Sequence, residues 1–406
     1  MTLECGTVLS PIPEILEDLK AGRMIVLVDD ERRENEGDFV CAAEFVDIET
    51  VNFMTRIGGG YLCVAMDNED CERLELHPQV STNTSVRGTP LTISVDGSPK
   101  HGVSTGISAS DRATTIQLLA SADSTPDDFV KPGHLNPLHA REGGVLARTG
   151  QTEGSVDLCR MAGLRPAAAI IEIVKPDGEM ARMPDLEEIC KEHDLKMCSV
   201  EQVIEQRLAH ETLITRSTPE SGTPVETPWG VFNLIVFNST IDAQPHLALT
   251  LGDVGRLDGR GNVVEIEDPV MVRVHRRDVL GDIFHAGNNP SGDMLHASMK
   301  AIQKEGRGAL VYLRPEHMGD DLTGRIHKIQ RPDDDDPNRP DLTRGDGVAG
   351  RAQPMDTRNL GIGSQLLREL GLSKLRLLVS RARDYPALHG FGLEITEQVE
   401  IGSSDS

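Results

Sequence analysis

The densest group of chemically capable side chains in this sequence is an acidic segment near its N-terminal end. Residues 29–38 read Asp-Asp-Glu-Arg-Arg-Glu-Asn-Glu-Gly-Asp, which is six carboxylates and two arginines. Packing so many acids together costs repulsive energy unless a cation or a polar ligand lies among them. A solvated acidic loop is the alternative, since most runs of charge are of that kind. Here the acids follow the apolar run Met24–Val28, and ligand sites in α/β proteins concentrate at strand ends, so we interpret the segment as a binding site.

Two residues elsewhere could move protons. Glu172 interrupts the apolar run Ala167–Val174, and a carboxylate inside a buried strand is costly unless it is paired, bound to a cation or protonated. The other interpretation of Glu172 is an edge strand with the acid facing water. His134 ends the loop-forming stretch that begins at Lys131, where a single histidine is weak evidence of a site by itself.

A small, hydroxyl-rich segment, residues 102–111, runs into a predicted helix over Arg112–Ala122. Backbone N–H groups at that helix start, with nearby hydroxyls, could hold a phosphate. A capping loop with Ser110 or Asp111 as N-cap explains the pattern equally well.

The elements that must position these groups alternate along the chain, which indicates an α/β (α+β) protein of two domains. A polar stretch over Arg207–Thr227 marks the boundary, so we expect domains over 1–207 and 227–402 with a linker over 208–226. Residues 331–350 are too polar and too rich in proline to pack, and we expect a mobile insertion there. Strands are predicted over 24–28, 61–66, 91–95, 167–174, 229–238, 270–274, 309–313 and 375–380, and helices over 12–19, 51–57, 112–122, 156–161, 183–189, 199–208, 294–305 and 359–370.

Composition excludes several classes of function. A formal charge of −24 argues against nucleic acid or an anionic membrane as partner, because both require clustered Lys and Arg. No apolar stretch approaches the ~20 residues that span a bilayer, and the N-terminal stretch lacks the pattern of a signal peptide, so we expect a cytoplasmic protein. The seven cysteines are an odd number, all before residue 200, and none has C-x-x-C spacing. A disulfide framework and a structural zinc site are therefore not expected.

The first half of the chain resembles 3,4-dihydroxy-2-butanone 4-phosphate synthase, a lyase of riboflavin biosynthesis. Several long motifs occur in the family's order, which makes the resemblance specific. They are Asp29-Asp30-Glu31, Arg33-Glu34-Asn35-Glu36-Gly37-Asp38, Ser81-Thr82-Asn83, Gly106-Ile107-Ser108, Asp111–Ile116, Pro132-Gly133-His134, Arg148-Thr149-Gly150, Val156-Asp157-Leu158 and Ile171-Glu172-Ile173.

The resemblance implies conversion of ribulose 5-phosphate to 3,4-dihydroxy-2-butanone 4-phosphate and formate, by a homodimer whose sites are shared between subunits. It makes His134 and Glu172 the two residues essential for catalysis. It implies Mg²⁺ or Mn²⁺ on Glu34, because a divalent ion would polarise the carbonyl. The substrate would be held by residues of the acidic segment, by Glu172 and by the stretch at 148–152: Arg33, Glu34, Asp38, Arg148, Thr149, Gly150, Gln151, Thr152 and Glu172.

One departure affects the metal. The family has a histidine ligand where this chain has Gln151. An amide oxygen suits hard Mg²⁺, but it offers no imidazole nitrogen and takes up no proton at neutral pH. We therefore expect Gln151 to take the ligand's place with weaker cation binding.

Residues 227–402 resemble GTP cyclohydrolase II, so the whole chain resembles the bifunctional fusion of the two enzymes. The family's three zinc cysteines are replaced by Asp278, Asn289 and Ser291, and a thiolate zinc site requires thiols. Asp278, Asp282 and His285 could in principle form an oxygen and nitrogen site, but a dead site is favoured. The stretch Glu316–Leu322 lacks the family's arginine, and an acid, Asp384, replaces its lysine. We expect this half to keep the fold, bind no Zn²⁺ and have lost the opening of the guanine ring.

Three functions stay open at this point. The chain is a dihydroxybutanone phosphate synthase with a non-catalytic second half, a degenerate regulatory or binding homologue, or a related pentose-phosphate lyase or isomerase of specialised metabolism. The first is favoured, because a drifting site seldom keeps several polar residues that cost stability.

Overall fold

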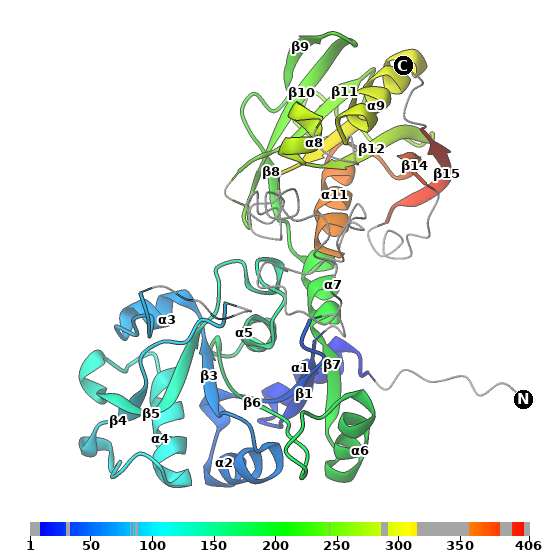
Figure 1. Ribbon diagram of the computed structural model, residues 1–406. Helices are drawn as coiled ribbons and strands as arrows, with labels where there is room; N and C mark the ends of the chain where they lie inside the picture. Colours follow the sequence, from blue (N-terminus) through cyan, green and yellow to red (C-terminus); the bar gives the residue numbers. More distant parts are fainter. Residues whose placement is uncertain are drawn as a thin grey trace, which may run out of the picture. The chain divides into compact units, whose positions relative to one another are not determined.

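The computed structural model describes residues 9–29, 33–81, 83, 85, 88–242, 244–285, 291–314, 357–381 and 392–401. It divides into two compact units, Met1–Gln206 and Arg207–Ser406, each built on one sheet (Figure 1). The insertion expected over 331–350, the Glu316–Leu322 stretch, Asn289 and Asp384 lie outside the described residues.

The first unit holds a sheet of seven strands, counted over the described residues, in the order β4-β5-β3-β6-β2-β1-β7 (Figure 1). The pairs β1–β7 and β3–β5 are parallel and the remaining pairs are antiparallel. The strands are β1 (Ile25–Val28), β2 (Gly37–Ala42), β3 (Cys63–Met66), β4 (Val95–Gly97), β5 (Phe129–His139), β6 (Ala167–Glu172) and β7 (Lys196–Ser199).

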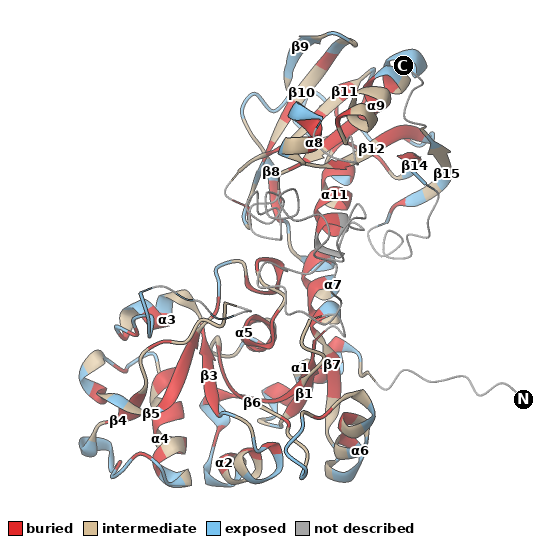
Figure 2. Ribbon diagram, viewed as in Figure 1, coloured by how far each residue is buried: buried red, intermediate tan, exposed pale blue. Residues whose placement is uncertain are grey.

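Helices cover both faces of this sheet, which is why its central strands are buried along almost their whole length, with Glu172 at the end of β6 only partly buried (Figure 2). Helices α2 (Ile48–Phe53), α4 (Ala109–Ala120) and α6 (Met183–His193) pack on the face of Phe39 and Ile171. Helices α1 (Ile12–Lys20) and α5 (Gln151–Met161) contact the strands from the other side. Two further helices are α3 (Asn68–Arg73) and α7 (Val200–His210).

The second unit holds an eight-stranded sheet, again counted over the described residues, in the order β15-β14-β12-β13-β11-β10-β8, with β9 paired to β10. Helix α11 (Thr357–Glu369) packs on one face through Ile362 and Leu366, and α9 (Ser291–Glu305) packs on the other through Met299 and Ile302. A short helix, α8 (Val279–Phe284), precedes α9. The strands are β8 (Ile214–Arg216), β9 (Thr223–Thr227), β10 (Gly230–Ser239), β11 (His246–Leu251), β12 (Val270–Arg276), β13 (Gly308–Leu313), β14 (Lys374–Val379) and β15 (Glu394–Glu400).

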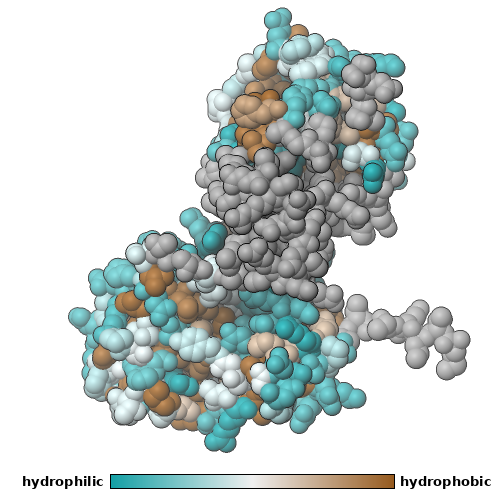
Figure 3. Space-filling model, in the orientation of Figure 1, coloured by the Kyte–Doolittle hydropathy of each residue, from teal (hydrophilic) through white to brown (hydrophobic). Residues whose placement is uncertain are grey.

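The surface of the second unit exposes some large apolar side chains. Figure 3 shows hydrophobic atoms gathered on the visible face of this unit. Ile283 and Phe284 at the end of α8 are 65% and 68% exposed. Within the described residues, no helix is both long and apolar enough to cross a membrane.

The mixed α/β architecture with two sheets agrees with the expected fold class, and several elements differ in detail. Gly37 and Asp38, expected in an acidic loop, begin strand β2. Residues 131–134 belong to the long strand β5 rather than to a loop, and residues 91–92 make only isolated bridges. The segment expected as a linker, 208–226, holds the end of α7, strand β8 and most of β9. Pairing with β10 orders these polar residues, which their local composition does not reveal.

Candidate active site

Asp38 and Glu172 are direct partners across strands β2 and β6. The backbone N–H of Ile173 donates to the carbonyl of Gly37 at 3.0 Å. Because side chains alternate along a strand, both acids lie on the opposite face from Phe39 and Ile171, which is the α5 face. Opposite side chains of such a pair have Cβ atoms about 5 Å apart. The register thus places two carboxyls beside each other on one face, where like charges repel.

The pKa values show that further acids share this site. The pKa of Asp38 is raised well above its usual range by burial first, and then by Glu172, Glu34, Glu36 and Asp29. Burial also raises the pKa of Glu36, with Glu34 adding to the effect and Arg182 opposing it. Each of these acids therefore lies close enough to Asp38 to influence its ionisation. The segment at 29–38 and Glu172 form one carboxylate cluster, defined here as Asp29, Glu34, Glu36, Asp38 and Glu172.

Arg33 is the cation within this cluster. Its Nη1 donates to Asp29 at 2.7 Å, to Glu34 at 2.7 Å and to the amide oxygen of Gln151 at 3.0 Å. Burial disfavours the charged guanidinium, but Glu34 and Asp29 outweigh it and raise the pKa of Arg33. Asp29 also accepts the backbone N–H groups of Glu34 and Glu36 at 3.1 and 2.9 Å. The buried Asp29 carboxylate thereby fixes the turn that carries Glu34 and Glu36.

The stretch from Arg148 to Thr152 forms the loop and first turn of α5. Gln151 and Thr152 are buried on the sheet, while Thr149 and Gly150 lie in the preceding turn. The first N–H groups of α5 have no partner within the helix, as at any helix start, and are suited to an anion. Arg148 is only 11% exposed and donates to Glu153 at 2.6 Å, an acid whose pKa burial raises. This guanidinium is therefore tied to the helix start rather than free in solvent.

His134 lies at the same end of the sheet as Glu172. Cys63 of β3 pairs with Asn136 of β5 on one side and with Ile170 of β6 on the other. His134 and Glu172 are each two residues beyond this row, in the direction of Tyr61.

Tyr61 forms hydrogen bonds to residues of both neighbouring strands, β6 and β5. Its backbone N–H donates to Glu172 Oε2 at 2.7 Å, and its hydroxyl donates to Asn136 Oδ1 at 2.7 Å. Just before it, a Cβ on Gly60 would come within 2.5 Å of the Glu172 carbonyl oxygen, so this glycine permits the close approach. Tyr61 thus links Glu172 to β5, the strand that carries His134.

Sequence reasoning missed three residues that hold this site. Arg182 donates to the Glu34 carbonyl at 2.8 Å and to the Asn35 carbonyl, and no sequence signal points to it. Tyr61 gave no signal either. Asp96 bonds His134 through its carboxylate, and its strand of three residues is too short to mark it in the sequence.

The residues present fit a divalent cation. The acids outnumber the cations around the cluster, and their mutual repulsion shows in the raised pKa of Asp38 and Glu36. The oxygen atoms of Glu34 and Gln151 lie close together, since both accept from one nitrogen of Arg33, and a cation held by both would compete with that guanidinium. Over the described residues no three acids, cysteines or histidines form a complete metal group. Mg²⁺ is commonly held by one or two protein oxygens, with substrate and water completing its shell.

Two of the replaced zinc-cysteine positions, Asp278 and Ser291, lie in the described residues, and both side chains make hydrogen bonds within the second unit. Asp278 caps α8 by accepting the Gly281 N–H at 3.1 Å. Buried Asp282 accepts from the Ser291 hydroxyl at 2.7 Å and from the Tyr312 hydroxyl at 2.7 Å, and lies 2.9 Å from His275 Nε2. Burial opposes ionisation of Asp282, but the bond to His275 outweighs it and its pKa is lowered. These donors do not fit a thiolate zinc site.

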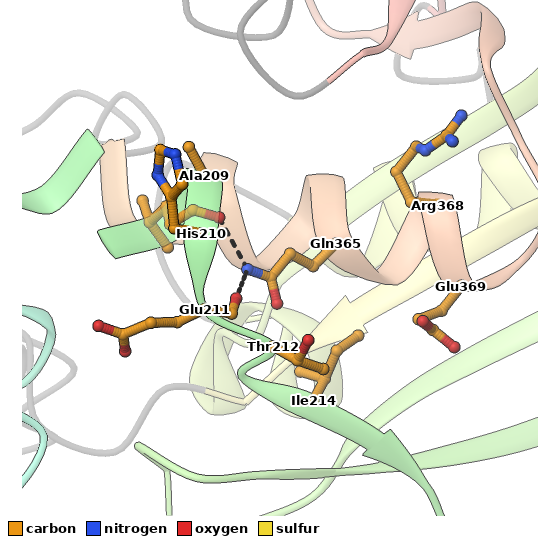
Figure 4. Close-up of a pocket in the computed structure, with 9 residues that line it drawn as sticks. Ala209, His210, Glu211, Thr212, Ile214, Gln365, Arg368 and Glu369 are labelled. Carbon is orange, nitrogen blue, oxygen red and sulfur yellow. Dashed lines mark hydrogen bonds between the residues drawn. The ribbon is translucent and has the colours of Figure 1, made fainter. Parts of the chain in front are cut away.

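A hollow of about 270 Å³ in the second unit lies between the end of α7 and α11 (Figure 4). Gln365 spans it, donating to the carbonyls of Leu208 and Glu211 at 2.9 and 2.7 Å. Gln365 also accepts the Leu213 N–H at 3.0 Å. The hollow shares no residue with the carboxylate cluster, and the hydrogen bonds of Gln365 fasten the end of α7 and the residues after it to α11.

Comparisons with known proteins agree with this division. The family model of 3,4-dihydroxy-2-butanone 4-phosphate synthase matches residues 13–206, and that of GTP cyclohydrolase II matches residues 218–400. Riboflavin biosynthesis protein RibBA of Aquifex aeolicus is 42% identical, over 96% of this chain and 92% of that protein. RibBA of Cytophaga hutchinsonii is also 42% identical, over 97% and 92%.

A solved structure matches both units. RibBX, a two-domain 3,4-dihydroxy-2-butanone 4-phosphate synthase from A. baumannii, is similar with a TM-score of 0.73 and 33% identity. The match covers 95% of this chain and 98% of RibBX. Fold and site define the first unit as a lyase, a 3,4-dihydroxy-2-butanone 4-phosphate synthase of riboflavin biosynthesis. The chain as a whole belongs to the RibBA family of riboflavin biosynthesis proteins.

Proposed function

We propose that the carboxylate cluster of the first unit converts ribulose 5-phosphate to 3,4-dihydroxy-2-butanone 4-phosphate and formate, with Mg²⁺ or Mn²⁺ as cofactor. The observation that carries the proposal is the strand pair Asp38–Glu172 within a cluster of acids that repel one another. Such a cluster gains stability from a bound cation, and the pKa values of Asp38 and Glu36 are raised within it. Enolisation, dehydration and the hydrolytic loss of one carbon require a group that donates a proton and a group that accepts one.

In this proposal each part of the site has one task. His134 and Glu172 take up and return protons at the substrate carbons, and Asp38 keeps its proton to higher pH than a free carboxyl. Arg33 and Asp38 contact the sugar, and the α5 start from Arg148 to Thr152 holds the phosphate.

A bound cation would be held by Glu34 and the amide oxygen of Gln151, and would polarise the substrate carbonyl. Tyr61 holds the Glu172 carboxylate by its backbone N–H, so the acid meets the substrate in one orientation.

Assembly and domain roles are part of the same proposal. The enzyme acts as a homodimer, as the family resemblance implies. Synthase activity belongs to residues 1–207, and residues 227–402 form a non-catalytic domain that binds no Zn²⁺ and has lost cyclohydrolase activity. The hydrogen bonds that occupy Asp278 and Asp282 support this loss. The cytoplasmic location and the absence of nucleic-acid and membrane partners stay predictions.

The test is to incubate the purified chain with ribulose 5-phosphate and Mg²⁺ and to identify the products by NMR. Dihydroxybutanone phosphate and formate in equal amounts are expected, with no turnover by Glu172→Ala. A different pentose-phosphate product, or none, would overturn the proposal. For the second unit, one tightly held zinc ion per chain together with formate release from GTP would contradict the loss of activity.

A further inference from the structure

The Asp96 carboxylate holds His134 at two points. Oδ1 accepts the backbone N–H of His134 at 2.8 Å, and Oδ2 lies 2.7 Å from the ring nitrogen Nδ1. An ionised carboxylate only accepts hydrogen bonds, so Nδ1 must carry the proton and donate. The second ring nitrogen, Nε2, is thereby left without a hydrogen in the neutral ring.

The ring needs this support because it is half exposed. The His134 side chain is 47% exposed, whereas that of Asp96 is 12% exposed. A surface histidine with no partner samples several rotamers, and fixing it costs conformational entropy. With both the backbone and the ring bonded to one buried acid, that entropy is lost on folding rather than when substrate binds.

The backbone around His134 is shaped for this contact. Val95 pairs with Leu135, but Asp96 pairs with Val130, so residues 131–134 leave the β4–β5 ladder as a bulge. Gly133 packs on the β4 backbone so closely that a Cβ there would come within 2.0 Å of the Val95 carbonyl carbon. Its N–H donates to the Ser94 carbonyl at 3.1 Å. The bulge therefore presents His134 from a fixed position.

Asp96 is itself confined by the hydroxyl-rich loop before α4. Gly106 has a φ of +80°, and a Cβ there would lie 2.1 Å from Asp96 Oδ2. The loop is held by Asp111, which accepts the Gly106 N–H at 3.0 Å. The loop backbone thus packs closely against the Asp96 carboxylate.

We propose that Asp96 is a positioning residue of the synthase: its carboxylate fixes the orientation and the Nδ1–H tautomer of His134, so that Nε2 is the nitrogen that exchanges a proton with substrate. This inference rests on the proposed role of His134 in proton transfer. The same logic applies wherever a buried acid orients a proton-transferring imidazole. His134 gains and loses one proton in each catalytic cycle, since the proton taken up at Nε2 is returned from Nε2.

The central test is Asp96→Asn in the full-length chain. The asparagine oxygen still accepts the His134 N–H, but its amide group donates to Nδ1 and so favours the Nε2–H tautomer. We expect kcat to fall at least ~100-fold with little change in KM, as for loss of a general acid–base group. Nitrogen-15 NMR, with the His134 signal identified by its loss in His134→Ala, should show the proton moved from Nδ1 to Nε2. An unchanged tautomer, or an unchanged kcat, overturns the inference.

Two glycines give a test that leaves Asp96 in place. Gly106→Ala and Gly102→Ala both put alanine at positive φ, +80° and +83°, so both carry similar backbone strain. Only Gly106→Ala drives a methyl group into Asp96. A Cβ at Gly102 would have no atom within 4 Å apart from its own chain neighbours. We expect the kcat loss in Gly106→Ala alone. Equal activity of the two variants would contradict the inference.

His134→Ala separates this inference from the proposed function. If His134→Ala keeps full activity, the proposed role of His134 fails and the Asp96 inference with it. If His134→Ala is inactive while Asp96→Asn is fully active, only the positioning role of Asp96 is wrong. A matched control is Asp128→Asn, because Asp128 lies 2.7 Å from the ring of His101 in the same unit and outside the site. This control should leave kcat unchanged.

Discussion

Arg33 and Gln151 are 118 positions apart in the sequence, and the guanidinium of one donates to the amide oxygen of the other at 3.0 Å. The same nitrogen of Arg33 bonds Glu34 at 2.7 Å. The two side chains proposed to hold the cation are therefore already drawn together by a positive charge. This contact makes Gln151 the residue whose replacement is most informative about the metal.

Replacing Gln151 with histidine should strengthen binding of Mn²⁺ more than that of Mg²⁺. An imidazole nitrogen suits transition metals, whereas an amide oxygen suits hard Mg²⁺. We expect the Mn²⁺ dissociation constant to fall ~10-fold, within the range by which ligand surroundings change metal affinity. Electron paramagnetic resonance of free Mn²⁺ measures it, with Gln151→Ala as the contrasting variant. Weaker Mn²⁺ binding by Gln151→His would contradict the assignment of this position.

The first unit should become less stable as pH rises when no divalent cation is present. Burial and neighbouring acids raise the pKa of Asp38 and Glu36, so the folded state binds more protons than the unfolded chain. Stability then falls as pH rises from about 4, the ordinary carboxyl value, through the raised values. Hydrogen exchange of β2 amides, measured by mass spectrometry with EDTA and with Mg²⁺, reports this unit.

Asp38→Asn provides the control for that pH dependence. The amide is never charged, so the slope should flatten and stability at pH 8 without cation should rise. Activity should be lost in the same variant because the proposed contact of the Asp38 carboxyl with the sugar is changed. A pH slope as steep as that of the unaltered chain would show that Asp38 does not carry the effect.

Replacing Arg182 with alanine should weaken Mg²⁺ binding, although Arg182 has no proposed contact with the substrate. Arg182 binds the Glu34 and Asn35 carbonyls and so holds the loop that carries the proposed cation ligand. Loss of such support typically costs ~10–100-fold in metal affinity. Isothermal titration with Mg²⁺ measures it. Arg160→Ala is the matched control, since Arg160 pairs with Asp157 at 3.0 Å and is 53% exposed, and it should bind Mg²⁺ normally.

Asp282→Asn should destabilise the second unit by about 2–4 kcal/mol, because several buried donors lose their ionised acceptor. Trp229 is the only tryptophan of the chain and lies in this unit, so its fluorescence follows unfolding of the second unit alone. A zinc chelator should leave the same transition unchanged. A chelator-sensitive transition would show that the unit does hold a structural metal.

The sequence predicted the parts of the site that leave a local mark. An acid inside an apolar run identified Glu172, and the charge density of residues 29–38 identified the cluster. Strand β2 was not predicted, because Gly37 and Asp38 are residues that strands disfavour and only pairing with β1 and β6 orders them. Asp96 lies in a strand of three residues, too short for a period to show. The meeting of Arg33 with Gln151 depends on the tertiary fold, which no local pattern contains.

Two residues that pair directly across neighbouring strands seldom both carry a negative charge, and Asp38 and Glu172 form such a pair. One consequence is that Asp38, whose pKa is raised, keeps its hydrogen ion to a higher pH than a free carboxyl does. Arrival of a cation or of an anionic sugar alters the field around that ion and shifts its equilibrium with solvent. Heats of ligand binding should accordingly differ between buffers of different ionisation enthalpy.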